Sequence, residues 1–289
     1  MRVSRRHFLG TSTASIAAGT MLGGSPNAAA APDEDHAVEM VPVPYALQLY
    51  TVRDRLAEDV PGTLKKVKEI GYDYVELAGT WNRTVEEAKA LLDEAELTPV
   101  SAHVGVGPVI NDTDTMIAFA KTLGVEFLGM GIGRSPAETW IATGKALNEA
   151  GAKFREEGIH ICYHNHAAEF DLFDGITGYD LLLREAAPAN LGVQIDTYWV
   201  KDAGLDPADM ILRYAERCRL LHMKDMTDGD PHTFAEVGQG ILDWPSIFAA
   251  GAKVGVEWYT VEQDRSAVGS IESARISAEF MKNARIPAG

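Results

Sequence analysis

The chain has 289 residues, of which 46% are hydrophobic and 24% charged, and its 42 acidic and 26 basic residues give a net charge of -16. Such an acidic surface repels phosphate backbones and disfavours nucleic acid as a partner. The two cysteines, Cys162 and Cys218, both lie in apolar strand contexts, so we expect core residues and no disulfide framework. A single pair between them in an exported protein stays open.

The amino terminus is predicted to be an export signal. Ser4-Arg5-Arg6-His7-Phe8-Leu9 is a twin-arginine pattern, and small apolar residues follow it up to the alanines at 28–31. A membrane anchor is disfavoured because this stretch is shorter than the ~20 apolar residues that span a bilayer. We therefore predict a signal peptide at 1–31, a tether at 32–41, no stable membrane span after cleavage, and a periplasmic or secreted protein. Cleavage removes three arginines, which leaves 42 acids against 23 bases, or -19.

The remaining 248 residues, 42–289, fit one domain of (β/α)₈ size. Short apolar runs predict eight strands: Tyr45–Val52, Tyr74–Leu77, Pro99–Val104, Phe127–Met130, Ile159–Asn165, Leu191–Thr197, Leu220–Lys224 and Trp258–Gln263. Amphipathic stretches between them predict eight helices: Pro61–Ile70, Val85–Ala95, Asp114–Leu123, Pro136–Glu157, Gly178–Glu185, Asp206–Glu216, Pro245–Ala252 and Ile271–Lys282. This alternation predicts an α/β fold with a single TIM barrel as the catalytic domain.

Four of the predicted strands end on polar residues that can carry chemistry. Leu220–Asp225 ends on His222, Lys224 and Asp225, and the other three runs reach His166, Asp196 and Glu262. The carboxyl ends of barrel strands meet at one face, where TIM barrels build their active sites. We therefore expect one convergent site.

Strand alternation decides which of these side chains face the barrel axis. If Asp196, His222 and Glu262 point inward, so do Gln194, Lys224 and Thr260. On the fifth strand the choice is between Tyr163 with Asn165 and Cys162 with His164 and His166, and we favour the second phase because it adds imidazoles to the site.

Histidine and carboxylate side chains at these ends offer nitrogen and oxygen donors to one divalent cation. Manganese, cobalt, zinc and magnesium all accept such donors, with manganese our first choice. Each residue alone could instead be a polar group that hydrogen-bonds to loop backbone. Together they predict a metal site, and whether His164 or His166 is the fifth-strand ligand stays open.

Five motifs in order resemble the sugar phosphate isomerase/epimerase superfamily of xylose-isomerase-like barrels: Tyr163–Phe170, Gln194–Thr197, Leu221–Asp225, Val237–Trp244 and Val261–Asp264. The resemblance runs from about Tyr45 to the carboxyl terminus. It implies one divalent metal held by His164, Asp196, His222 and Glu262. Many members have a glutamate where this chain has His164, which argues against the two-glutamate proton shuttle of the ketose 3-epimerases.

A metal that chelates a carbonyl and the adjacent hydroxyl acidifies the C–H between them and stabilises an enediolate. A nearby base must then move the proton, and the candidates are Glu262, Glu169 and His166. Lys224 either stabilises the enolate oxygen or binds a hydroxyl, or it pairs with Asp225.

Further polar residues on the strands are candidates for substrate binding: Gln48, Tyr50, Glu76, His103 and Trp199. His103 could equally be a core histidine bonded to backbone. Trp199 could stack on a sugar face or pack at the barrel mouth.

The sequence thus predicts a metal-dependent isomerase or epimerase that acts on a small carbohydrate through an enediolate. A lyase or dehydratase acting on a keto-inositol or a 3-keto-glycoside is the alternative, since it uses the same enolate. A non-catalytic sugar-binding protein is a third hypothesis. An apurinic-site endonuclease is disfavoured because the chain has only eight histidines and an acidic balance. A homo-oligomer stays open.

Overall fold

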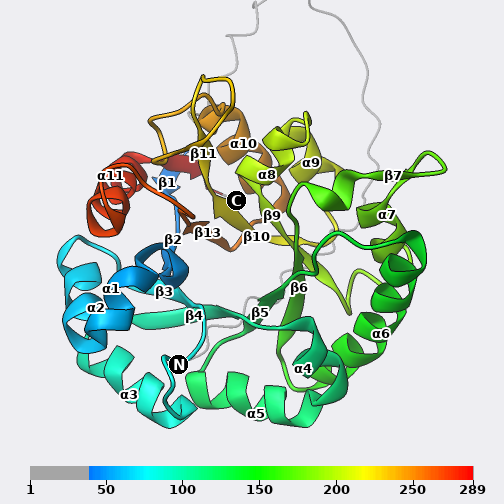
Figure 1. The fold of residues 1–289 in the computed structure, drawn as a ribbon, viewed down its shortest axis with the longest axis horizontal. Coiled ribbons are helices and arrows are strands. Elements are labelled where there is room, and N and C mark those ends of the chain that lie inside the picture. The colour runs from blue at the N-terminus through cyan, green and yellow to red at the C-terminus, as the bar shows by residue number, and fades with distance from the viewer. Residues whose placement is uncertain (1–38, 289) are drawn as a thin grey trace, which may run out of the picture. The chain divides into compact units, whose positions relative to one another are not determined.

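A closed barrel of eight parallel strands forms the centre of the molecule (Figure 1). The computed structural model describes residues 39–288, so the predicted signal peptide and residues 32–38 of the tether lie outside the described range. In barrel order the strands are β2 (Tyr45–Gln48), β3 (Tyr74–Leu77), β4 (Thr98–His103), β5 (Phe127–Met130), β6 (His160–His164), β9 (Gly192–Asp196), β10 (Cys218–Met223) and β13 (Trp258–Val261). The predicted TIM barrel is confirmed.

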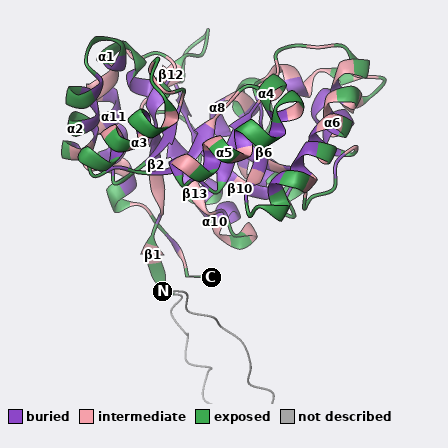
Figure 2. Ribbon diagram, turned by 90° about the horizontal axis from the view of Figure 1, so that it is seen from below, coloured by how far each residue is buried: buried purple, intermediate pink, exposed green. Residues whose placement is uncertain are grey.

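Helices surround the barrel and bury their apolar faces against it (Figures 1 and 2). Those that follow the predicted pattern are α2 (Val60–Glu69), α3 (Val85–Glu94), α5 (Thr113–Leu123), α6 (Ala137–Glu156), α7 (Gly178–Leu183), α9 (Pro207–Arg213), α10 (Trp244–Val254) and α11 (Ser270–Asn283). Three short helices in the loops after strands were not predicted: α1 (Arg53–Glu58), α4 (Val106–Asn111) and α8 (Thr197–Asp202). Six residues give too little periodicity for a helical pattern to show. Among residues 39–288, none of the helices has both the length and the apolar character needed to cross a membrane.

The first barrel strand is shorter than the sequence predicted. It ends at Gln48, whose side-chain oxygen accepts a hydrogen bond from the backbone N–H of Tyr50 at 3.0 Å. This bond starts a 3₁₀ turn, η1 (Leu49–Val52), in place of the last half of the predicted strand. The Tyr50 side chain therefore lies at the barrel mouth and is 43% exposed.

Three small antiparallel pairs accompany the barrel. β1 (Met40–Pro42) pairs with β14 (Arg285–Pro287), so Met40 and Val41, which the sequence placed in the tether, are part of a hairpin-like pair with the carboxyl terminus (Figure 2). β7 (Leu172–Phe173) pairs with β8 (Ile176–Thr177) in the loop after β6. β11 (Asp225–Met226) pairs with β12 (Phe234–Ala235) in the loop after β10. The loop after β6 also contains a short 3₁₀ helix, η2 (Ala168–Phe170).

The barrel interior has a small apolar layer of its own, separate from the large core between strands and helices. Phe127, Cys162 and Leu220 form this cluster, and Trp258 packs against it. Cys162 and Leu220 thus face the axis, as the favoured strand phases require. Both cysteines are buried and free, which agrees with their predicted place in the core.

Helix α6 packs unusually close to α7 and to the segment that leads into β9. A Cβ atom at Gly151 would lie 1.9 Å from the carbonyl oxygen of Asn190, and one at Gly144 would lie 2.3 Å from that of Leu182. The glycines are seven residues apart, so both are on one face of the helix. This close approach sets the position of β9, which carries Asp196 into the site.

We predict that Gly151→Ala destabilises the protein by about 1–3 kcal/mol, because the added methyl group forces two backbone segments apart. The free energy of unfolding from denaturant titration measures the effect. The exposed residue Glu149 on the same helix is the control, and Glu149→Ala should stay within ~0.5 kcal/mol of the wild type. Equal stabilities of the two variants would contradict the packing argument.

Candidate metal and active site

A polar layer lies above the apolar one inside the barrel, with Glu76 of β3 at its centre. Its carboxylate accepts hydrogen bonds from the side chains of Gln48, Ser101 and Gln194, the last at 2.7 Å. Gln194 can reach it because β5 has Gly129 opposite, where a Cβ atom would lie 2.7 Å from the Gln194 side-chain oxygen. Glu76 is fully buried. Its role is therefore to hold the neighbouring side chains in place through these hydrogen bonds.

His222 of β10 is held between two carboxylates. Its Nε2 lies 2.8 Å from Oε1 of Glu76, and its Nδ1 lies 2.8 Å from Oε2 of Glu262. Burial alone would lower the pKa of His222, but the two carboxylates outweigh it and raise the pKa to about 10. The imidazole is therefore fixed in position and orientation from both sides.

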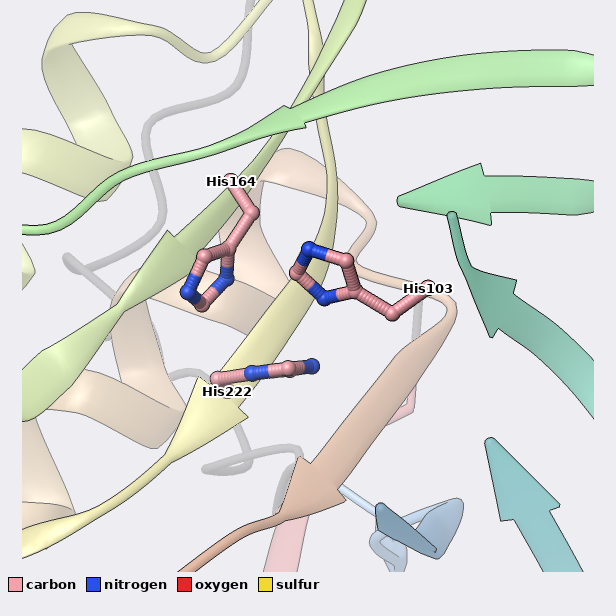
Figure 3. Close-up of side chains that lie close together, drawn as sticks. All are labelled: His103, His164 and His222. Carbon is pink, nitrogen blue, oxygen red and sulfur yellow. The ribbon is translucent and has the colours of Figure 1, made fainter. Parts of the chain in front are cut away.

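Four predicted ligands come together at this level. Each of His164, Asp196, His222 and Glu262 offers one donor atom, and these atoms all lie within 4.8 Å of one another. All four residues are buried. His103 approaches the same point: its ring centroid is 5.0 Å from that of His164, and the rings of His103, His164 and His222 lie close together (Figure 3).

Buried donor atoms in the cluster fit a bound cation. Nδ1 of His164 is buried without a hydrogen-bond partner, although buried polar atoms are almost always paired. Oδ2 of Asp196 also lacks a hydrogen bond, and it lies 3.2 Å from the Lys224 ammonium as an ion pair. Burial raises the pKa of Asp196, and burial with the neighbouring histidines lowers that of His164, which keeps its ring neutral and able to donate a lone pair. The residues present therefore fit a divalent cation.

Lys224 lies directly after β10 and reaches into the same cluster. Its Nζ is 2.8 Å from Glu262, 3.2 Å from Asp196 and 3.0 Å from Asp264. Burial opposes the charge of the ammonium, but these three carboxylates raise the pKa of Lys224, which stays protonated. The pairing with Asp225 that the sequence left open does not occur.

The charges around the cluster do not balance within the protein. The carboxylates are those of Glu76, Asp196, Glu262 and Asp264, and they face the Lys224 ammonium and His222, which must release its imidazolium proton to bind a metal. An excess of negative charge in a buried space is costly unless a cation offsets it. This excess favours a bound cation.

His166 sits outside the donor cluster, two residues beyond His164, with its side chain 47% exposed. Its backbone N–H donates to the buried carboxylate of Glu169 at 3.0 Å, and its Nδ1 lies 3.9 Å from that carboxylate, too far for a hydrogen bond. Burial lowers its pKa, but the carboxylates of Glu169 and Asp196 outweigh burial and raise it. Glu169 is fully buried and also accepts from the Tyr163 hydroxyl, so it fixes the backbone at His166.

A pocket of about 350 Å³ opens above the cluster. Of the residues predicted to bind substrate, Gln48, Tyr50 and His103 line it, together with His164, His166, Lys224, Glu262 and Asp264. Trp199 lies beside it: its ring is 5.6 Å from that of His166, and Lys224 Nζ lies 5.9 Å from the Trp199 ring centroid. Glu76 is enclosed below the pocket.

Asp225 has a structural role that the sequence did not reveal. Its buried carboxylate accepts hydrogen bonds from the backbone N–H groups of Met226, Gly238, Gly240 and Leu242 and from Nε1 of Trp244. A Cβ atom at Gly240 would lie 2.2 Å from this carboxylate. The glycines of the 237–244 motif thus allow the loop to fold around Asp225.

We predict that Asp225→Ala lowers the free energy of unfolding by about 3 kcal/mol or more, because several buried donors lose their acceptor. The exposed residue Asp228 on the same loop is the control, and Asp228→Ala should change stability by less than ~0.5 kcal/mol. Denaturant unfolding measures both. A loss below ~1 kcal/mol for Asp225→Ala would show that this carboxylate does not organise the loop.

Asp264 is a site residue without a predicted role. It lies two residues after Glu262 in the predicted motif Val261–Asp264. Its pairing with Lys224 could not be inferred from strand alternation, because the strand ends at Val261.

A family model described as xylose isomerase-like TIM barrel matches residues 64–284. An inosose dehydratase from Geobacillus thermodenitrificans is 24% identical over 164 residues, which cover 50% of this chain and 54% of that protein. The chain thus spans about half the length of the curated relatives it matches.

Solved structures share the fold. A sugar phosphate isomerase/epimerase from Parabacteroides distasonis superimposes with a TM-score of 0.74 at 22% identity, and the match covers 84% of this chain and 95% of that one. IolI protein with a bound zinc atom gives a TM-score of 0.62 at 15% identity, covering 83% and 96%.

Proposed function

This chain belongs to the xylose isomerase-like TIM barrel family, whose members are enzymes, and from that premise we propose that it is a divalent-metal-dependent sugar isomerase or epimerase. The observation that carries the proposal is the buried cluster of His164, Asp196, His222 and Glu262 at the carboxyl ends of four strands. The substrate is a small carbohydrate or keto-sugar whose C–H bond next to a carbonyl loses its proton to give an enediolate.

The four cluster residues would hold the cation, with manganese preferred and cobalt, zinc or magnesium as alternatives. When bound, the cation would supply Lewis-acid polarisation of the substrate carbonyl. The zinc atom in the IolI neighbour supports a metal in this fold. His103, whose pKa is lowered mainly by burial, is a neutral hydrogen-bonding group on the opposite wall.

His166 is the proposed base. It lines the pocket, its backbone is held by Glu169, and the nearby carboxylates raise its pKa, which makes the ring a stronger base. Glu262 is a weaker base, because Lys224 and His222 outweigh burial and hold its pKa well below the usual range. The Lys224 ammonium, directed at the cluster, stabilises negative charge on the substrate oxygen.

A lyase or dehydratase is the second candidate, and one observation favours it. An epimerase removes and returns a proton on opposite faces, which calls for two bases, whereas the described residues around the pocket provide one well-placed base, His166. Elimination of a leaving group from the enolate needs only one. The curated relatives named inosose dehydratase agree with this alternative.

The twin-arginine motif adds the proposal that the enzyme acts in the periplasm or is secreted. A non-phosphorylated substrate suits that location.

Metal content tests the cluster directly. We expect the purified protein to hold a divalent metal and Asp196→Ala to lose most of it, because losing even an outer partner of a ligand costs about 10–100-fold in metal affinity. Asp264→Ala is the matched control: it also removes a carboxylate beside Lys224, but one outside the donor cluster, so metal should be retained. Elemental analysis by mass spectrometry reads out all three proteins, and equal metal in wild type and Asp196→Ala would refute the site.

Turnover tests the base. On ketoses and 3-keto-glycosides, His166→Ala should lower kcat about 10²–10⁴-fold, the usual contribution of general base catalysis. The exposed His232, whose ring bonds only to the Thr227 carbonyl among the described residues, is the control, and His232→Ala should keep the wild-type rate. A changed stereocentre with deuterium taken up from solvent identifies an epimerase; released water or aglycone identifies a lyase.

A further inference from the structure

A second pocket adjoins the active-site pocket at the barrel mouth. It has a volume of about 310 Å³ and lies between α1 and the loop that follows β3. Tyr50 and Ala78 line both pockets, so the two hollows are neighbours that share one wall. The second pocket therefore adds space for a ligand beside the active-site pocket.

The floor of the second pocket includes a turn in a strained backbone conformation. Trp81 has a φ of 56° and Asn82 a φ of 59°, in the left-handed region that is a genuine outlier for a bulky residue. The turn is closed by Thr80 and Arg83: the Arg83 N–H donates to the Thr80 carbonyl at 3.0 Å, and the Thr80 hydroxyl donates to the Arg83 carbonyl at 2.8 Å. Such strain is concentrated at ligand clamps, and here it presents an indole ring at the pocket.

The shared wall is also fixed. The guanidinium of Arg53 lies 3.9 Å over the Tyr50 ring and donates to the carbonyl oxygens of Tyr50 at 2.8 Å and Asp264 at 2.7 Å. Because both of these donors are bonded to backbone, Arg53 holds the wall rather than clamping an anion. The same contact ties the second pocket to Asp264, which pairs with Lys224 in the active site.

Tyr50 and Trp81 line the second pocket beside the polar side chains of Asn82 and Arg83. Aromatic side chains beside hydrogen-bond donors suit a sugar ring, which has apolar C–H faces and hydroxyl groups at its edges. We propose that the second pocket is a subsite for the second ring of the substrate, so that the enzyme acts on disaccharides or glycosides. The reacting ring occupies the catalytic pocket and the linked ring lies against Trp81. Which ring reacts rests on the proposed function, but the subsite itself does not.

Calorimetric binding of three probes tests the subsite: glucose, cellobiose and p-nitrophenyl β-glucoside. We expect the two-ring probes to bind at least about tenfold more tightly than glucose, and Trp81→Ala to remove this gain while leaving glucose unchanged. Trp81→Phe, which keeps a ring, should retain part of it. Tyr74→Ala is the matched control, because Tyr74 is an exposed aromatic residue at the opposite end of β3.

Equal affinities for the three probes, including no measurable binding of any, overturn the proposal, as does a gain that survives in Trp81→Ala. If Trp81→Ala fails to fold, Asn82→Gly serves instead, since glycine suits the left-handed backbone. This variant should weaken the binding of cellobiose but not that of glucose. An unchanged affinity for cellobiose counts against the subsite. The tighter binding of the two-ring probes should persist in the metal-depleted Asp196→Ala variant. If the enzyme shows no turnover but still binds the two-ring probes more tightly, the proposed reaction is refuted and the subsite is not.

Discussion

The imidazole of His222, held between the carboxylates of Glu76 and Glu262, is the interaction on which the site depends. It joins three strands through the barrel interior, because β3 carries Glu76, β10 carries His222, and Glu262 follows β13. Glu76 in turn is fixed by side chains from β2, β4 and β9. Closing the barrel therefore fixes the orientation of this histidine, and in the function that we propose such a preorganised group would cost little reorganisation.

Much of this could be predicted because strand alternation is strict. The eight strands, the inward phase of Cys162 and His164, and the meeting of His164, Asp196, His222 and Glu262 follow from apolar runs that end on polar residues. The end of the first strand could not be predicted, because Tyr45–Val52 contains no glycine or proline to mark a turn, while a single hydrogen bond to the Gln48 side chain turns the backbone.

Partners beyond the strands were harder to predict than the strands themselves. Lys224 and Asp225 are neighbours in sequence, but consecutive side chains point to opposite sides. Lys224 thus turns to Asp196, Glu262 and Asp264, and Asp225 turns to the 237–244 loop. The role of Glu76 depends on side chains far away in the sequence, which no local pattern reveals.

His164 alters the electrostatics of the site as well as its donor set. A glutamate at this position would add a third negative charge to the four donors and a second carboxylate able to move protons. With a neutral imidazole there, the donors carry the two charges of Asp196 and Glu262, and Glu262 is further occupied by Lys224 and His222. In the mechanism that we propose, proton transfer then falls to His166, which is more exposed than the buried cluster residues. The proposed base, His166, lines the pocket that shares Tyr50 with the second pocket. This arrangement suits a substrate whose second group, whether it is eliminated or kept, extends out of the barrel.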